Sequence, residues 1–480
     1  MHLRRTAGLA AAGLLTLLGL ATPAHAAGVP PTAAGDSRSV SQPVLPPICT
    51  TLSAQLAPTN RQFSSADEQN PPDTARIQTA LNSCKVSGSS TAAVELTGSG
   101  ADNAFLSGPL TVGPGVVLLI NSGTTLYASL NPADYQVSGG ATCGSLSSSS
   151  STGCQALITV DGAGAGVMGI RSASGAQGMI DGRGDLDMYG TSTSWWQLSA
   201  NAKSAGDKQN NPRMIEVSNT SNVTVYDLDI VNAPLFHIYA EGVNGLTVWG
   251  VRIKTPATAR NTDGIDPDSS TNVTINQSYI QDGDDGVAIK TNSAAAANIT
   301  VENSNFYGTH GMSIGSETNY GITNVLFQNN TVNGSDTSGN VSGDNNGIRI
   351  KSYPGKGGTV SQVTYDDTCM TGVRHALEFN PAYSSGSGSI PEFTDVVVNG
   401  AVAQNSVSGA GSLLDGYNSS NLLGLTLENV SLDATSTSAQ YANIGLYNTD
   451  ISPSGTGVTV TSVSGSGSVP SCTFPAYPGL

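Results

Sequence analysis

The chain has 480 residues and a formal net charge of −16, and it contains 57 glycines but only 11% charged residues. Long surface helices depend on Glu, Lys and Arg, so this composition argues against a mainly helical protein and favours short strands joined by turns. The acidic balance also argues against nucleic acid as a partner, because phosphate backbones are bound by basic surfaces.

The first 26 residues have the pattern of a secretory signal peptide. A basic pair at 4–5 precedes an apolar run at 14–20, and Ala-His-Ala at 24–26 is a cleavage pattern. The apolar run is too short to span a membrane, and no later segment reaches the required length. We therefore predict a secreted, extracellular protein with no membrane partner after cleavage. Residues 27–48 are rich in Ala, Pro, Ser and Thr, and we expect a flexible lead-in there.

The next predicted element is a short helix over residues 73–84. Asp73 is suited to the N-cap position, and Ile77, Ala80, Leu81 and Cys84 would share one apolar face. We expect this helix to cover the open N-terminal end of the repeats that follow.

Six cysteines in an exported chain predict disulfides and not metal ligands. Proximity in the sequence favours two pairs, Cys49–Cys84 and Cys143–Cys154. Cys369 and Cys472 would then join the C-terminal tail to the body. The five histidines are scattered and no Cys-x-x-Cys motif occurs, so we predict neither a metal nor a cofactor.

Short β-branched segments recur along the rest of the chain. Their anchors Val223, Leu246, Val273, Ile299 and Val325 are 23, 27, 26 and 26 residues apart, and a second short strand follows each anchor. Such a unit cannot bury its own apolar face and is stabilised by stacking on its neighbours. We predict one all-β domain over 49–480, a right-handed parallel β-helix, and we expect a monomer because a capped solenoid needs no partner.

Polar motifs follow one another at intervals of about one or two of these repeats. They are Asn-Thr-Asp-Gly at 261–264, Gly-Asp-Asp-Gly at 283–286, Thr-His-Gly at 309–311 and Arg-Ile-Lys at 349–351. Stacked coils lie about 4.8 Å apart, so residues at equivalent positions line up on one face. We expect one cleft to contain Asp263, Asp284, Asp285, His310, Arg349 and Lys351.

Each motif has a simpler interpretation when it is taken alone. Asn-Thr-Asp-Gly could be a turn, Asp-Asp a loop or calcium contact, the histidine a structural turn residue and Arg-x-Lys a solvated strand face. Their order and coil spacing favour a shared site for acid/base hydrolysis of an acidic sugar polymer.

These motifs resemble those of the polygalacturonases of glycoside hydrolase family 28. The resemblance extends from Phe-Leu-Ser-Gly-Pro-Leu at 105–110 to Gly-Ile-Arg-Ile-Lys at 347–351. Asp-Asp-Gly-Val-Ala-Ile-Lys at 284–290 and His-Gly-Met-Ser-Ile-Gly-Ser-Glu at 310–317 are most similar to the bacterial branch. One departure is Gly286, where family members often carry cysteine or asparagine.

The resemblance implies hydrolysis of α-1,4-galacturonosyl bonds of polygalacturonate with inversion at the anomeric carbon. Asp284 would be the general acid, and Asp263 and Asp285 would activate the attacking water. One carboxyl of such a cluster is expected to keep its proton because like charges raise a pKa. His310 would hydrogen-bond to Asp284 and help to set its protonation state.

The resemblance also implies a group of substrate-binding residues. Arg349 and Lys351 would bind a sugar carboxylate beside the cleavage point, and Tyr383 would line the cleft. Lys290 is a further candidate that could equally be a solvated strand residue. Asn261 is another candidate, although we expect it mainly to fix the turn that aims Asp263.

Other functions remain open from the sequence. We favour endo action because no N-terminal domain is appended and few large insertions lie near the motifs. An exo-polygalacturonase or a rhamnogalacturonan hydrolase of the same family would carry similar motifs. A calcium-dependent pectate lyase would need a carboxylate cage and a basic residue, and a non-enzymatic β-helix carbohydrate-binding protein would need only the repeats.

Overall fold

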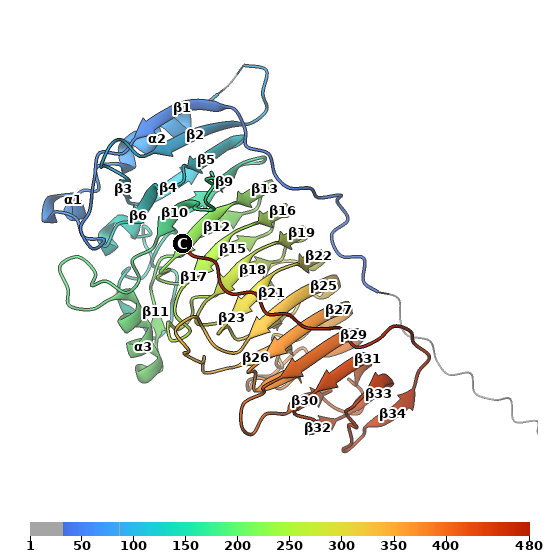
Figure 1. Ribbon diagram of the computed structural model, residues 1–480. Helices are drawn as coiled ribbons and strands as arrows, with labels where there is room; N and C mark the ends of the chain where they lie inside the picture. The colour runs from blue at the N-terminus through green and yellow to red at the C-terminus, as the bar shows by residue number, and fades with distance from the viewer. Residues whose placement is uncertain (1–31, 86) are drawn as a thin grey trace, which may run out of the picture.

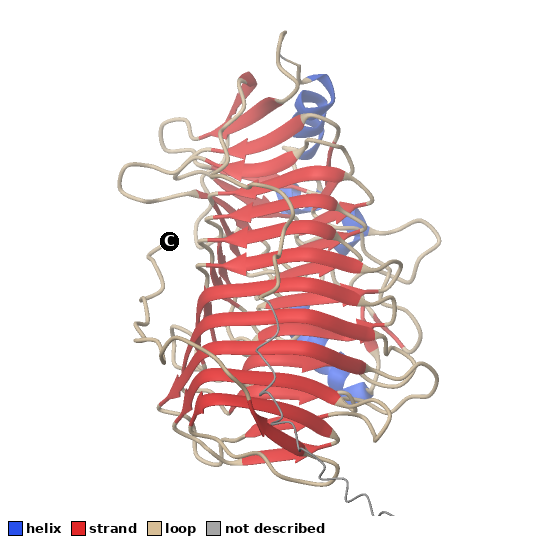
Figure 2. Cartoon of the chain, turned by 90° about the vertical axis from the view of Figure 1, so that its right-hand side faces the viewer, coloured by secondary structure: helices blue, strands red, loops and turns tan. Residues whose placement is uncertain are grey.

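The computed structural model describes residues 32–85 and 87–480, so the expected signal peptide at 1–26 lies outside the described residues. Parallel strands stack coil upon coil into an elongated column (Figure 1), and Figure 2 shows successive strands lying one above another along its length. This architecture is a parallel β-helix, and it confirms the fold class that the repeat length predicted.

One wall of the column is an 11-stranded sheet whose strands pair in parallel with the corresponding strand of the next coil. Its strands are β4 (Leu110–Val112), β8 (Ile158–Val160), β12 (Ile215–Ser218), β15 (Ile238–Glu241), β18 (Ile265–Asp268), β21 (Val287–Thr291), β24 (Met312–Thr318), β26 (Asn346–Lys351), β28 (His375–Asn380), β30 (Ser412–Asp415) and β32 (Thr437–Gln440). This wall carries the polar motifs.

The other walls belong to a 21-stranded parallel sheet. Its strands are β1 (Ile48–Ser53), β2 (Ala92–Thr97), β3 (Ala104–Ser107), β5 (Val116–Ile120), β6 (Thr125–Ala128), β9 (Gly166–Gly169), β10 (Gly178–Asp181), β13 (Ser221–Tyr226), β14 (Leu228–Val231), β16 (Asn244–Trp249), β17 (Arg252–Lys254), β19 (Thr271–Asn276), β20 (Tyr279–Gln281), β22 (Ala296–Glu302), β23 (Asn305–Tyr307), β25 (Ile322–Asn333), β27 (Thr359–Thr371), β29 (Glu392–Gln404), β31 (Leu423–Leu432), β33 (Ala442–Thr449) and β34 (Thr459–Ser462). Two ladders of short strands join at β25, which pairs with both β22 and β23.

Asparagines form the bends between the walls and explain the recurring Asn in the sequence repeats. Asn272, Asn298 and Asn324 all have positive φ, near 56–59°, a conformation that asparagine tolerates better than most residues. They also bond from coil to coil, because Asn298 Nδ2 donates to Asn272 Oδ1 at 3.1 Å and Asn324 Nδ2 to Asn298 Oδ1 at 2.8 Å. The side chains thus hold successive bends in register.

The interior of the column is filled by apolar side chains that stack along its axis. Ile280, Phe306 and Val332 occupy the same register in consecutive coils, and all three are fully buried. Phe327 stacks on Tyr365 of the next coil with ring centroids 4.4 Å apart. Because each coil buries its neighbour's apolar face, the fold is stabilised along its length without a globular core.

Few helices interrupt the strands, and none in the described part of the chain has the length and apolar character to cross a membrane. They are α1 (Ser65–Gln69), α2 (Thr74–Ser83), the 3-10 turn η1 (Pro132–Tyr135) and α3 (Trp195–Ala205). Helix α2 is the predicted capping helix, with Ile77, Ala80 and Leu81 buried. Asp73 lies at its N-cap position but makes no capping bond; its carboxylate accepts instead from the backbone N–H of Leu106 at 2.7 Å.

The lead-in differs from the flexible segment that we expected. Residues 33–42, here called the strap, lie across the ends of several coils, as the blue segment beside the column in Figure 1 shows. Its backbone N–H groups donate to Thr364 Oγ1 at 2.9 Å, Asn324 Oδ1 at 2.7 Å and Thr300 Oγ1 at 2.9 Å. The small residues of this segment let its backbone reach the polar side chains at the bends, which is why it is ordered.

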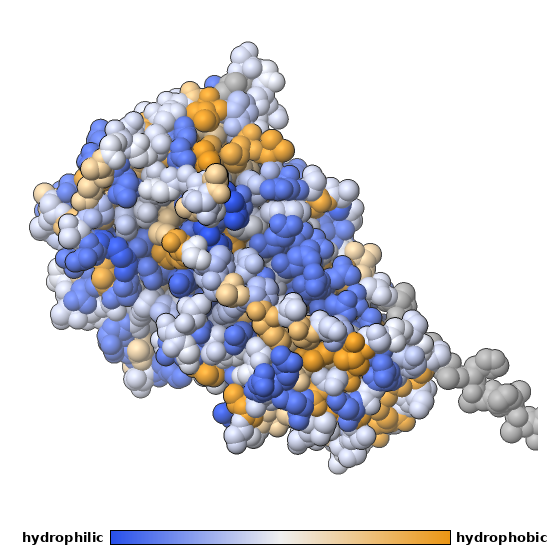
Figure 3. All heavy atoms as spheres, in the orientation of Figure 1, coloured by the Kyte–Doolittle hydropathy of each residue, from blue (hydrophilic) through white to orange (hydrophobic). Residues whose placement is uncertain are grey.

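Apolar residues outside the main core are few and scattered. Val40 of the strap packs on a small outer cluster that includes Met168, Tyr226 and Trp249. On the face drawn in Figure 3, apolar residues form small separate patches among hydrophilic ones.

All three expected disulfides form, Cys49–Cys84, Cys143–Cys154 and Cys369–Cys472. The last one directs the C-terminal tail back along the column, where it ends over its middle (Figure 1). There Tyr477 Oη donates to the Ile253 carbonyl at 2.8 Å, and Tyr307 Oη donates to the Pro475 carbonyl at 2.8 Å.

Candidate active site

The register of the 11-stranded sheet brings the polar motifs together. Ile265 of β18 pairs with Val287 of β21, which pairs with Met312 of β24. Asp263, Asp285 and His310 each lie two residues before one of these strand positions and therefore occupy equivalent places in consecutive coils. The interval of 21 residues from Asp263 to Asp284 is about one repeat and by itself pairs these two residues. The register instead makes Asp285 the equivalent of Asp263 and places Asp284 beside it.

Asp284 is held by bonds from three sides. Nδ1 of His310 lies 2.9 Å from Oδ1 of Asp284, and Nδ2 of Asn261 donates to Oδ2 at 3.1 Å. The Asp284 backbone N–H donates to Oδ1 of Asp282 at 3.0 Å. Asn261 has φ of 57°, so it shapes the turn before Asp263 as expected, and it also contacts Asp284 directly.

Asp285 is buried against the cationic motif. Its Oδ2 accepts a hydrogen bond from Nζ of Lys351 at 2.7 Å, and its Oδ1 accepts one from Oγ of Ser313 at 2.7 Å. Nη1 of Arg349 lies 3.5 Å from Oδ1. The two cations expected to bind substrate are therefore also the counter-ions of a candidate catalytic carboxylate.

Asp263 shares its counter-ion with a second aspartate. Nζ of Lys290 lies 3.4 Å from Oδ2 of Asp263 and 2.7 Å from Oδ2 of Asp266. Lys290 also lies over the ring of Phe236, 4.9 Å from its centroid, and its side chain is only 12% exposed. Lys290 is thus a buried ion-pair partner and not the solvated strand residue that was the alternative.

Burial opposes the ionised form of each carboxylate, and the neighbouring charges decide the outcome. At Asp284, the charge and hydrogen bond of His310, helped by Lys351, outweigh burial and lower the pKa. At Asp285, the charges of Lys351 and Arg349 outweigh burial and also lower the pKa. Both residues are therefore ionised in the free protein.

At Asp263 the nearest negative charges act in the same direction as burial. Burial and the negative charges of Asp266 and Asp284 raise its pKa well above the ordinary value. His310 is also affected, because burial opposes its charge but Asp284 overcomes this and raises its pKa above 6.5. We had expected one carboxyl of the cluster to keep its proton and had assigned it to Asp284. Of the three candidate catalytic carboxyls, Asp263 has the raised pKa, and the proton next to Asp284 is on His310. Burial also raises the pKa of the neighbouring Asp266 and Asp282.

Arg349 and Lys351 lie beneath an aromatic ring at the edge of the cleft. The guanidinium carbon of Arg349 is 5.2 Å, and Nζ of Lys351 is 5.0 Å, from the centroid of the Tyr383 ring. Tyr383 is 40% exposed and lines the cleft, as expected. Nε of Arg349 is also 2.9 Å from Oε2 of Glu378 on the next coil, and its Nη2 is 3.0 Å from Oδ2 of Asp344.

The cleft over these groups has a volume of about 870 Å³. Eight of the nine candidate residues line this cleft directly. The ninth, Arg349, lies beneath Tyr383. A second hollow of about 510 Å³ shares Phe236, Arg260 and Asn261 with the cleft and adds Lys208 and Arg213. The two hollows are therefore neighbours with a shared wall, and cationic side chains line both.

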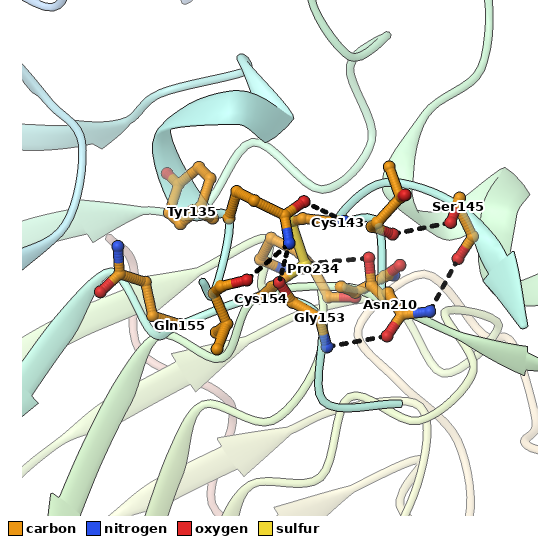
Figure 4. Close-up of a disulfide and its surroundings, with 12 residues drawn as sticks. Tyr135, Cys143, Ser145, Gly153, Cys154, Gln155, Asn210 and Pro234 are labelled. Atoms are coloured by element: carbon orange, nitrogen blue, oxygen red, sulfur yellow. Dashed lines mark hydrogen bonds between the residues drawn. A yellow bond between two sulfur atoms is a disulfide. The ribbon is translucent and has the colours of Figure 1, made fainter. Parts of the chain in front are cut away.

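Cys154 lines the second hollow, and Figure 4 shows its disulfide with Cys143. Asn210 lies beside it and bonds the loop in both directions: its Oδ1 accepts from the Gly153 backbone N–H at 2.9 Å, and its Nδ2 donates to the Ser145 carbonyl at 3.2 Å. The loop is also joined to the region after α3 by the antiparallel pair β7 (Leu146–Ser147) and β11 (Lys208–Gln209). This wall is consequently fixed covalently and by hydrogen bonds.

Ligand atoms of Asp284, Asp285 and His310 lie within 4.8 Å of one another, a spacing that could suit a metal ion. The same carboxylates are bonded to the protein's own cations, Asp284 to His310 and Asp285 to Lys351. These carboxylates therefore already have cationic partners among the described residues.

Several residues of the site were not predicted. Asp266, Asp282, Ser313 and Asp344 all hydrogen-bond to a predicted residue, and Glu378 lies within charge contact of Arg349. The acidic runs around Asp266 and Asp282 were a visible signal in the sequence. Glu378 could be found only from the register, which pairs it with Arg349 on the neighbouring strand of the next coil.

A parallel β-helix that places several carboxylates, a histidine and two cations in one groove has the groups needed for acid/base hydrolysis of a sugar polymer. Comparisons with known proteins agree with this class. Residues 142–460 match the model of the glycosyl hydrolases family 28. The chain belongs to this family, and it is a glycoside hydrolase.

Similar proteins cover most of the chain. A polygalacturonase of Ralstonia solanacearum is 38% identical over 465 residues, which cover 88% of this chain and 85% of the relative. An endo-polygalacturonase of Pectobacterium parmentieri is 37% identical over 408 residues, covering 84% and 91%. The solved polygalacturonase from Erwinia carotovora ssp. carotovora has a TM-score of 0.75 at 36% identity, covering 85% of this chain and 99% of that one.

Proposed function

We propose that the protein hydrolyses α-1,4-galacturonosyl bonds of polygalacturonate, the acidic backbone of pectin, and inverts the anomeric carbon. The observation that carries the proposal is the placement of Arg349 and Lys351 against Asp285, next to the Asp284–His310 pair. A sugar carboxylate bound by these cations would lie beside the carboxylates that cleave the bond. The printed names of the Ralstonia and Pectobacterium relatives support the same substrate.

In this proposal, Asp284 protonates the leaving oxygen. The free protein keeps the proton on His310, 2.9 Å away. A bound galacturonate would neutralise Lys351, which is one of the charges that lower the pKa of Asp284. Substrate binding would therefore favour transfer of the proton from Nδ1 of His310 to Oδ1 of Asp284, from where it passes to the leaving group.

The attacking water lies on the opposite side of the sugar ring in an inverting hydrolase. We assign its activation to Asp263 and Asp285. Asp285 accepts the proton because its pKa is lowered and it is ionised, whereas Asp263 orients the water. Lys290 and Asn261 then act mainly on the carboxylates, through the pairs with Asp263 and Asp284.

The two neighbouring hollows support endo action. A polymer bound at the cleft can extend past Phe236 and Arg260 into the second hollow, where Lys208 and Arg213 supply positive charge. An exo enzyme would instead need this end of the groove to be closed. The name of the Pectobacterium relative as an endo-polygalacturonase agrees with this choice.

We also propose that the enzyme acts outside the cell as a monomer. Its three disulfides are typical of an oxidising compartment. The scattered apolar patches on the face in Figure 3 offer little surface for a stable subunit contact.

The test is incubation of the purified protein with polygalacturonate in EDTA, following reducing ends and the absorbance of unsaturated product together. New reducing ends without unsaturated product are expected, with internal cleavage giving a mixture of oligomer lengths. Release of a single short product would mean exo action. Unsaturated product that forms with calcium and is lost in EDTA would overturn hydrolysis in favour of a lyase.

A further inference from the structure

Arg349 has donors that the protein does not satisfy. Its side chain is 1% exposed, and among the described residues its Nε and Nη1 find no acceptor with hydrogen-bond geometry. Glu378 and Asp285 are close enough for charge attraction but are not aligned with these donors. Within the described part of the chain, the one side-chain hydrogen bond that Arg349 makes is from Nη2 to Oδ2 of Asp344, at 3.0 Å.

Asp344 is also the carboxylate that is best able to move. Its side chain is 46% exposed, whereas those of Asp285 and Glu378 are 2% and 11% exposed. It belongs to the loop between β25 and β26, and its neighbours Val341 and Gly343 line the cleft with it. Asp285 and Glu378 are fixed in or next to strands of the sheet.

We propose that Asp344 competes with the substrate for Arg349: it occupies the guanidinium in the free protein, and a galacturonate carboxylate displaces it. This inference rests on the proposed function. The charges of Arg349 and Lys351 already face three carboxylates, Asp285, Glu378 and Asp344, so a fourth negative group can enter favourably only if one leaves. Asp344 leaves, and the incoming carboxylate takes over its hydrogen bond and the free donors of Arg349.

This exchange makes Asp344 a specificity-determining residue. An ionised sugar replaces the charge that it displaces, so the loss of the Asp344 bond is compensated. A methyl-esterified sugar brings no charge and gives no such compensation. An esterified sugar therefore does not displace Asp344, and removal of Asp344 changes its binding little, whereas the same removal frees Arg349 to bind ionised sugars more strongly.

The test is the Asp344→Asn variant, with Asp344→Ala as a second variant that leaves no acceptor. We expect KM for polygalacturonate to fall about three- to tenfold with kcat unchanged, because a competing partner is lost and no catalytic group is touched. On highly methyl-esterified pectin, KM should fall less than on polygalacturonate, because only a carboxylate can use the freed guanidinium.

Asp161→Asn is the charge-matched control. Asp161 is an exposed residue directly after β8, six strands from β26 in the same sheet, or roughly 29 Å at the usual strand spacing. The proposed competition would be overturned if KM were unchanged in both Asp344 variants or fell equally in Asp161→Asn. It would also be overturned if KM fell equally on polygalacturonate and on esterified pectin. A wild-type protein without activity on polygalacturonate would instead overturn the proposed function, and this inference with it.

Discussion

Nδ1 of His310 lies 2.9 Å from Oδ1 of Asp284, and the two residues come from turns that are one coil apart. The raised pKa of His310 and the lowered pKa of Asp284 are two aspects of this one contact, so the pair titrates as a unit. The stacking of coils thus brings together two residues, 26 positions apart in the sequence, that share one proton.

Asp284→Asn tests the acid of this pair. The amide keeps the shape of the side chain and can still accept from Asn261, but it has no proton to donate to the leaving oxygen. We expect kcat to fall at least about a hundredfold, as for loss of a general acid. Melting temperature and far-UV circular dichroism serve as controls for the fold. Substantial turnover in a correctly folded variant would contradict the assignment.

The pH dependence of activity follows from His310. Its pKa is raised above 6.5, so the Asp284–His310 pair keeps its proton to higher pH than a free imidazole would. We expect the basic limb of the kcat/KM profile to lie above pH 6.5. His310→Asn removes the group that lowers the pKa of Asp284, so the remaining activity should decline at lower pH than in the wild type. A basic limb at the same pH in both proteins would refute the role of His310.

The raised pKa of His310 also affects the stability of the folded protein. A histidine whose pKa is higher in the folded than in the unfolded state stabilises the fold below its unfolded pKa of about 6.5. That contribution is lost as the pH rises through the folded pKa. His310→Asn should therefore lower the melting temperature more at about pH 5.5 than at about pH 9, which calorimetry of both proteins can check.

Lys351→Ala should affect both binding and chemistry. The lysine is expected to hold a sugar carboxylate, so its loss raises KM for polygalacturonate. It is also the first charge that lowers the pKa of Asp285, 2.7 Å away. Without it the pKa of Asp285 rises, and the acidic limb of kcat/KM should move to higher pH. Lys356→Ala is the matched control, at a half-buried position on the following loop where Nζ of Lys356 donates to Oδ1 of Asn292 at 3.4 Å. An unchanged KM and an unchanged acidic limb would show that Lys351 has neither role.

The fold was predictable because each coil repeats the same physical requirement. Every coil needs β-branched residues facing inward and a residue that tolerates positive φ at the bend, and both appear in segments such as Asn-Val-Thr-Ile at 272–275. The strap was not predictable in this way. Its Ala, Gly and Ser residues have the composition of a disordered segment, and its order depends on Thr300, Asn324 and Thr364, which are hundreds of residues away.

The site was predictable to the level of its motifs but not of its charge states. Coil spacing could place Asp263, Asp284 and His310 on one face, but only the register identifies Asp285 as the residue equivalent to Asp263. Which carboxyl keeps a proton depends on contacts of a few ångströms, such as those of Asp266 and Lys290 with Asp263. A sequence does not specify such distances until the register and the side-chain packing are known.

The strap gives a prediction that is independent of catalysis. Gly35 has φ of +70°, and a Cβ at this position would lie 2.1 Å from Oγ1 of Thr300. Gly35→Ala should therefore lift this part of the strap from the column. Arg38, whose Nη2 donates to the Leu246 carbonyl at 2.8 Å, would then become accessible, and we expect trypsin to cleave after it about tenfold faster.

Gly123→Ala is the matched control for this experiment. Gly123 has a similar φ of +73°, but a Cβ there would meet no atom within 4 Å. It therefore carries the same backbone strain, about 1 kcal/mol, without the clash. Faster cleavage after Arg38 in Gly35→Ala alone would show that close contact with Thr300 holds the strap. Equal cleavage in both variants and the wild type would mean that Asn324 and Thr364 hold it without help from Gly35.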